Sequence, residues 1–84
     1  MNYFVIVDVT LREGIADPEG STIERALPAL GFSGVTNVHA GKSFRLDVDA
    51  PDETAALEKA TALAERLLSN PVIENATARL GHKA

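Results

Sequence analysis

The stretch from Val35 to Asp49 constrains the fold of this chain more than any other, because its apolar side chains keep one spacing across a glycine. Side chains of a β-strand alternate between two faces, so residues two apart share a face. Even-numbered positions are mostly apolar on both sides of Gly41, and odd-numbered positions are mostly polar. The even apolar positions are Val38, Ala40, Phe44, Leu46 and Val48. Both halves of the stretch therefore present their apolar side chains to one face.

This shared face restricts how the chain turns at Gly41. A two-residue hairpin at Gly41 and Lys42 would put the apolar side chains of its strands on opposite faces, because directly paired residues share a face. Two arrangements keep the pattern: one long strand bent at Gly41, or a hairpin with a three-residue loop that pairs Val38 with Phe44. The stretch lacks the Asn-Gly or Asp-Gly signal of a tight hairpin, and a glycine inside a strand often marks a bend. We expect the long bent strand, with two strands as the alternative.

The length of this strand predicts a partner. A strand of about fifteen residues would span roughly 50 Å, whereas a compact domain of this length has a radius of gyration of roughly 12 Å. A strand that projects from its domain with one apolar face needs cover. A domain of 84 residues also buries only about 60 to 65% of the surface that its unfolded chain exposes, so its stability as a monomer should be marginal. We therefore expect a homodimer, or a dimer of dimers, whose interface contains Val38, Ala40, Phe44, Leu46 and Val48.

A first helix is predicted before this stretch. Asp17 and Pro18 are typical of an N-cap and a first helical residue, although Ser21 offers a rival start with capping-box spacing. Pro28 predicts a kink, because proline inside a helix removes one hydrogen bond. Gly31 predicts the end of the helix. Its apolar stripe consists of Ile23, Ala26, Leu27 and Leu30.

The remaining elements are two strands and a second helix. Residues 2–12 and 72–80 alternate as strands, and a helix is predicted to begin within residues 50–53 and to end before residues 70–71. The apolar stripe of this helix is Leu57, Ala60, Ala64, Leu67 and Leu68. The order is β-α-β-α-β, or β-α-β-β-α-β if the long strand divides. Both orders predict an α+β fold, a single domain over residues 1–84, with two helices packed on one face of an antiparallel sheet.

The sequence Gly41-Lys42-Ser43 matches the end of a P-loop, the phosphate-binding motif of many nucleotide-binding proteins. The full motif requires glycine at position 36, where this chain has Thr36. A P-loop also opens a helix, whereas the residues after Ser43 alternate as a strand. The spacing and the context therefore exclude a nucleotide site here.

The chain has few other residues that could act in catalysis or bind a metal. His39 lies on the polar face of the long strand, with no second histidine or carboxylate at ligand spacing, so we interpret it as a surface or interface residue. Asp47 and Asp49 share a strand face and are expected to be solvated. We expect no catalytic, cofactor-binding or metal-ligating residue in this chain, which favours an accessory or structural role.

Composition narrows the choice of partners and compartment. The chain has no cysteine, which fits a reducing compartment. A net charge of −4 argues against a general nucleic-acid or anionic-membrane binder. Residues 1–8 lack the basic start and the long apolar run of a signal peptide or a membrane span. We expect a cytoplasmic protein with neither nucleic-acid nor membrane partners.

Five segments, in this order and at these spacings, resemble the PurS family. They are residues 9–14 (VTLREG), 17–20 (DPEG), 29–32 (ALGF), 35–42 and 67–74 (LLSNPVIE). PurS is the small subunit of phosphoribosylformylglycinamidine synthase, an enzyme of purine biosynthesis. The resemblance extends from Tyr3 to about Ala78, and Pro28 departs from the usual pattern of the family.

The resemblance implies a non-catalytic subunit that pairs with itself and holds a glutaminase subunit against a large synthetase subunit. Such a complex converts formylglycinamide ribonucleotide, glutamine and ATP to formylglycinamidine ribonucleotide, glutamate, ADP and phosphate. ATP and Mg²⁺ would be used by the large subunit, and this chain would bind no cofactor of its own. The small subunit would help ammonia to pass between the two active centres.

Residues at the predicted bend are the candidates for contacts to the larger subunits. They are Arg12, His39, Gly41 and Lys42. The alternative is a free-standing α+β module that binds a small effector or regulates another protein, and that dimerises through its sheet.

Overall fold

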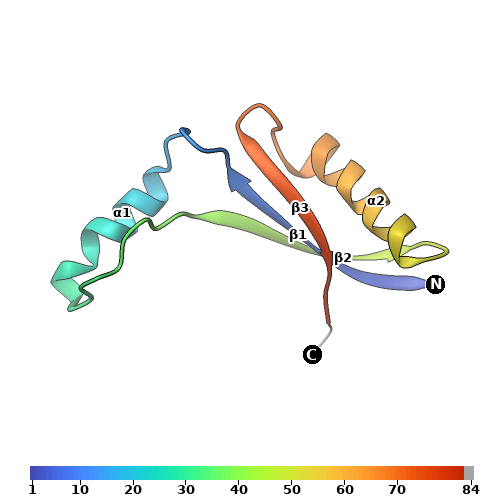
Figure 1. Cartoon of the computed structure of the whole chain (residues 1–84), viewed down its shortest axis with the longest axis horizontal. Helices are drawn as coiled ribbons and strands as arrows, with labels where there is room; N and C mark the ends of the chain where they lie inside the picture. Colours follow the sequence, from blue (N-terminus) through green and yellow to red (C-terminus); the bar gives the residue numbers. More distant parts are fainter. Residues whose placement is uncertain (83–84) are drawn as a thin grey trace.

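A computed structural model describes residues 1–82 of the chain and contains a three-stranded antiparallel sheet (Figure 1). The strands β1 (Asn2–Leu11), β2 (Gly41–Asp49) and β3 (Glu74–Leu80) lie in the spatial order β2-β1-β3. The helices are α1 (Pro18–Ala26) and α2 (Glu53–Leu63). The predicted α+β class, with two helices and an antiparallel sheet, is confirmed. The last two residues of the predicted domain lie outside the described part.

The hydrophobic core lies between the sheet and α2, which runs along one face of the sheet (Figure 1). Val5, Val7 and Val9 of the central strand are the largest fully buried side chains. α2 and the turn after it contribute three alanines, each 1% exposed or less: Ala56, Ala60 and Ala64. Small side chains let the helix approach the valines closely, and close packing is what makes apolar burial effective. The alternation of residues 2–12 places Val5, Val7 and Val9 on one face of a strand, and this is the face that the structure buries.

α2 turns a slightly different face to the core than its leucine pattern predicted. Its N-cap is Asp52, whose carboxylate accepts a hydrogen bond from the amide of Ala55 at 2.8 Å. Ala56 is fully buried, whereas Leu67 of the predicted stripe is 74% exposed. The helix continues as a wider π-turn over Ala64–Leu68, which rotates the later side chains away from the regular helical spacing.

α1 begins where the Asp-Pro pair predicted, with Asp17 as N-cap and Pro18 in the first turn. The expected kink at Pro28 is replaced by the end of the α-helix and a 3₁₀ turn over Pro28–Leu30. Pro28 has no amide hydrogen to continue the helical pattern. Gly31 then adopts a left-handed conformation with a φ of 86°, and the amide of Phe32 donates to the carbonyl of Leu27 at 3.0 Å. This geometry is a Schellman end, in agreement with the predicted role of the glycine.

The predicted strand from Val35 is wrong for residues 35–40, because β2 begins only at Gly41. The alternative hairpin does not form either, since β2 pairs with β1 in antiparallel register from Asn2↔Asp49 to Thr10↔Gly41. β1 ends at Leu11, one residue after that last pair, so within residues 1–82 no strand lies beside residues 35–40. They instead run along α1 as an irregular segment, with Asn37 at a φ of 56°.

Residues 17–40, here called the arm, extend beyond the end of the sheet (Figure 1). The sequence predicted that both helices pack on one face of the sheet. α2 lies on that face, whereas α1 lies in the arm. The Cα radius of gyration is 16.1 Å and the longest dimension is 51 Å. A compact domain of this length would have a radius of gyration of about 12 Å. The molecule therefore projects beyond its sheet, and the projecting part consists of a helix and an irregular segment rather than a strand.

Candidate assembly surface

The arm carries an exposed apolar surface. Its large apolar side chains are Ile23, Leu30, Phe32 and Val35, with exposed fractions of 45%, 68%, 57% and 47%. Ile23 and Leu30 belong to the stripe predicted for the first helix, and Gly20 is the one buried residue of α1. Exposed apolar surfaces of this kind mark sites of interaction with other proteins.

Asp17 joins the two halves of the arm. Its Oδ1 accepts a hydrogen bond from the amide of Gly20 at 2.9 Å, and its Oδ2 accepts one from the amide of Ala40 at 2.8 Å. The imidazole Nδ1 of His39 lies 3.6 Å from Oδ2. The hydrogen bonds from Gly20 and Ala40, together with the nearby His39, hold the pKa of Asp17 below its ordinary value of 3.8 against the opposing effect of burial. The carboxylate is thus an ionised acceptor that ties α1 to the segment before β2.

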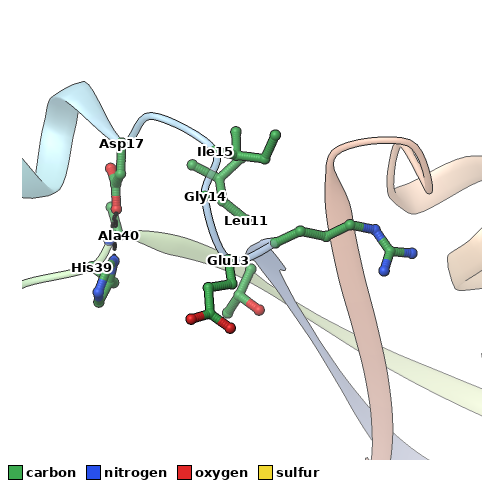
Figure 2. Close-up of a pocket in the computed structure, with 9 residues that line it drawn as sticks. Leu11, Glu13, Gly14, Ile15, Asp17, His39 and Ala40 are labelled. Atoms are coloured by element: carbon green, nitrogen blue, oxygen red, sulfur yellow. Dashed lines mark hydrogen bonds and ion pairs between the residues drawn. The ribbon is translucent and has the colours of Figure 1, made fainter.

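A cleft of about 500 Å³ lies at the junction between the arm and the sheet. Figure 2 shows Asp17 directed toward Ala40 and His39 on one side of this cleft, with Glu13 on the loop after β1 on the other. Thr10, Leu11, Arg12, Gly14 and Ile15 complete its lining. The cleft is bounded by both the arm and the sheet, so any change in the direction of the arm would alter its shape.

The four residues predicted to contact larger subunits gather around this junction. Arg12 and His39 line the cleft, and Gly41 and Lys42 line a neighbouring cleft that also contains Asp17. The guanidinium of Arg12 donates to the carbonyl of Pro71 at 2.9 Å. The ammonium of Lys42 lies 3.7 Å from a carboxylate oxygen of Glu74 in β3. His39 has a side chain that is 75% exposed.

The five residues predicted for an interface between copies are divided by the fold. Val48 is 6% exposed and belongs to the core of its own chain, and Phe44 and Leu46 pack against that core with part of their surface exposed. Val38 and Ala40 lie in the arm, half-buried against α1. The periodicity of the sequence assigned all five to one strand face, and the arm separates them.

Sequence reasoning missed the second role of Asp17 and the role of Glu24. Glu24 Oε1 accepts a hydrogen bond from the amide of Val38 at 3.0 Å. The Asp-Pro pair signalled the N-cap, but it carried no sign of the contact to Ala40, which lies 23 positions later. Contacts of this range depend on how the chain returns along α1.

The described residues offer neither a metal centre nor a membrane span. Among residues 1–82, His, Asp and Glu side chains form no group of three that could hold a metal ion. Within the same range, no helix is long and apolar enough to cross a bilayer.

The fold and the arm together define a small α+β domain whose apolar surface extends beyond its own core, as in a subunit of a larger assembly. Comparison with known families supports this class. The PurS family model, described as phosphoribosylformylglycinamidine (FGAM) synthase, matches residues 4–82.

Individual relatives and solved structures point to the same family. The chain is 43% identical over 68 residues to the phosphoribosylformylglycinamidine synthase subunit PurS of Archaeoglobus fulgidus, covering 81% of this chain and 85% of the relative. It is 42% identical over 72 residues to that of Mycobacterium leprae, covering 86% and 87%. The crystal structure of the Thermotoga maritima purS subunit superposes with a TM-score of 0.88 at 34% identity, covering 96% and 93%. A chain in the structure of PurLQS from the same organism gives a TM-score of 0.87 at 34% identity, covering 96% and 99%.

The chain belongs to the PurS family and is a subunit of phosphoribosylformylglycinamidine synthase, an enzyme of purine biosynthesis. The resemblance noted in the sequence is thereby confirmed.

Proposed function

We propose that this chain is a non-catalytic subunit that pairs with itself and joins a glutaminase subunit to a large synthetase subunit, so that ammonia passes between them. In this role the chain binds no cofactor. ATP and Mg²⁺ are bound by the large subunit, and the assembly works in the cytoplasm. The similarity to a chain of a PurLQS structure supports an assembled state.

The observation that carries the pairing is the surface of the isolated chain. Its accessible surface is 6092 Å² at a mass of 8.9 kDa. A compact monomer of this mass exposes about 4,800 Å², so this chain exposes about 1,300 Å² more. Two copies that covered this excess would bury about 2,600 Å² in total, which falls in the range of permanent complexes. Pairing therefore accounts for the shape of the molecule.

Apolar side chains of the arm and of the sheet indicate how the copies pair. The arm offers Ile23 and Leu30, and the helical face of the sheet offers the partly exposed Phe44 and Leu46 beside α2. The arm of one copy would cover this part of the sheet in the other. Val48 would not touch the second copy, but it packs in the core beneath this part of the sheet. Val38 and Ala40 would pack inside the arm, behind its exposed side chains.

The junction between the arm and the sheet is the proposed contact surface for the larger subunits. Arg12, His39, Gly41 and Lys42 lie around it, so a partner seated there would touch the arm and the sheet together. The side chains of His39 and Lys42 are 75% and 58% exposed, so both are accessible to a partner there.

Reconstitution of the complex tests this function. The purified glutaminase and synthetase subunits are assayed for amidation of formylglycinamide ribonucleotide with either glutamine or ammonium as nitrogen source, with and without this chain. We expect omission to abolish most of the glutamine-dependent rate and to leave the ammonium-dependent rate largely unchanged. An undiminished glutamine-dependent rate without the chain would overturn the proposal.

A further inference from the structure

Two carboxylates join the two halves of the arm. Asp17 and Glu24 lie on α1 or at its N-cap, and they accept hydrogen bonds from the amides of Ala40 and Val38 at 2.8 and 3.0 Å. Hydrogen bonds to an ionised acceptor are stronger than those between neutral groups. These side chains thus replace the neighbouring strand that residues 35–40 lack.

The backbone of α1 meets the same segment directly at Gly20. This residue is buried, and a Cβ atom built there would collide with the carbonyl oxygen of Val38 and with the Asp17 carboxylate. Since the clash with Val38 involves backbone, a side chain at position 20 would force the two halves of the arm apart. The contact therefore requires glycine.

The most exposed apolar side chains of the arm contribute little to its direction. Ile23, Leu30 and Phe32 are each 45% exposed or more, and Gly20 is the one buried residue of α1. Residue 40 is followed at once by β2, so its hydrogen bond to Asp17 joins the start of α1 to the start of a strand of the sheet.

We propose that Asp17 and Glu24, with the amides of Ala40 and Val38, form a clasp that holds α1 at the angle required for pairing before the second copy binds. The inference rests on the proposed pairing function and assigns Asp17 as its positioning residue. A surface that is ordered in advance avoids part of the entropy cost of association. Loss of the clasp should therefore weaken pairing without removing any apolar contact.

Asp17→Asn is the most informative variant. An asparagine side chain has one acceptor oxygen in place of two, so it retains the bond to Gly20 or to Ala40 but not both. Glu19→Gln is the matched control, because it removes one negative charge from the same helical turn, at a residue that is exposed. Gly20→Ala is a second route to the same effect, since it keeps both carboxyl groups in the sequence but its Cβ would collide with the carbonyl oxygen of Val38 and with the Asp17 carboxylate.

Two measurements on each full-length variant test the proposal. Amide hydrogen exchange reports on Ala40 and Val38, and sedimentation equilibrium gives the dissociation constant for pairing. For Asp17→Asn and Gly20→Ala we expect exchange at Ala40 at least tenfold faster and pairing at least fivefold weaker, with exchange at Val7 in the sheet unchanged. Glu19→Gln should match the wild type in both measurements.

Several outcomes would overturn the clasp. Unchanged exchange at Ala40 in Asp17→Asn would show that the arm does not depend on the carboxylate. Faster exchange with unchanged pairing would show that the direction of the arm does not matter for assembly. A wild-type chain that remains monomeric would contradict the proposed pairing itself and with it the stated purpose of the clasp, while its exchange data still decide whether the clasp holds the arm.

Discussion

The layer formed by the sheet and α2 buries its apolar side chains, whereas the arm leaves the same kinds of side chain in solvent. Val7 is fully buried against the alanines of α2, and Leu30 of the arm is 68% exposed. The layer is held by apolar packing. The arm is held by hydrogen bonds from backbone amides to Asp17 and Glu24. An amphipathic pattern thus indicates which side chains need cover, but not whether their own chain supplies it.

The largest expected difference between the two regions comes from introducing the same charge into each. Val7→Asp would place an unpaired carboxylate in the core, which costs about 4 kcal/mol or more and leaves the chain largely unfolded. Leu30→Asp should change the stability of the monomer by less than about 0.5 kcal/mol. Urea denaturation followed by circular dichroism in dilute solution measures both. Comparable losses would mean that the arm is packed as tightly as the layer.

The next effect concerns pairing. Ile23→Ser combined with Leu30→Ser should weaken self-association at least thirtyfold, which corresponds to about 2 kcal/mol, because both side chains lose apolar contacts with the second copy. Sedimentation equilibrium measures this change, and circular dichroism should show an unaltered fold. Val72→Ser is the control, because Val72 is 79% exposed but lies outside the arm. If the control dissociates the pair and the double variant does not, the interface lies elsewhere.

The smallest effect is a response of the arm to acid. The pKa of Asp17 is lowered in the folded chain, so its contribution to stability is present above its ordinary value of 3.8 and is lost as the pH falls through the lower folded value. The amide resonance of Ala40 should therefore shift with a midpoint below pH 3.8, and that of Val7 should not follow it. The same titration of Asp17→Asn should lack this transition. A midpoint at or above 3.8 for Ala40 would argue against an ionised clasp.

Several local elements could be predicted because each depends on residues close in sequence. Alternation identified the buried valines of β1, and the Asp17-Pro18 pair identified the start of α1. Gly31 ends that segment as predicted, and it does so in a left-handed conformation. The cost of a missing amide or an unfavourable φ is local, so these features follow from short-range chemistry.

The extent of β2 could not be predicted in the same way. Residues 35–40 continue the alternation of β2, but a strand needs a neighbour for its backbone hydrogen bonds. β1 ends at Leu11, and the amides of Val38 and Ala40 are satisfied by α1 instead. Which group takes a backbone hydrogen bond is decided by distant parts of the chain.

The sequence by itself predicted the α+β class, the alternation of β1 and a first helix that begins at Asp17 or Ser21, and it led us to expect a partner. Only the tertiary structure decided that exposed apolar side chains lie on α1 and on the segment that returns along it, whereas Phe44 and Leu46 pack against the core. The physical reason is that burial and long-range hydrogen bonding depend on where separate elements meet. The spacing of side chains along one element fixes which of them share a face, but it leaves open what that face will meet.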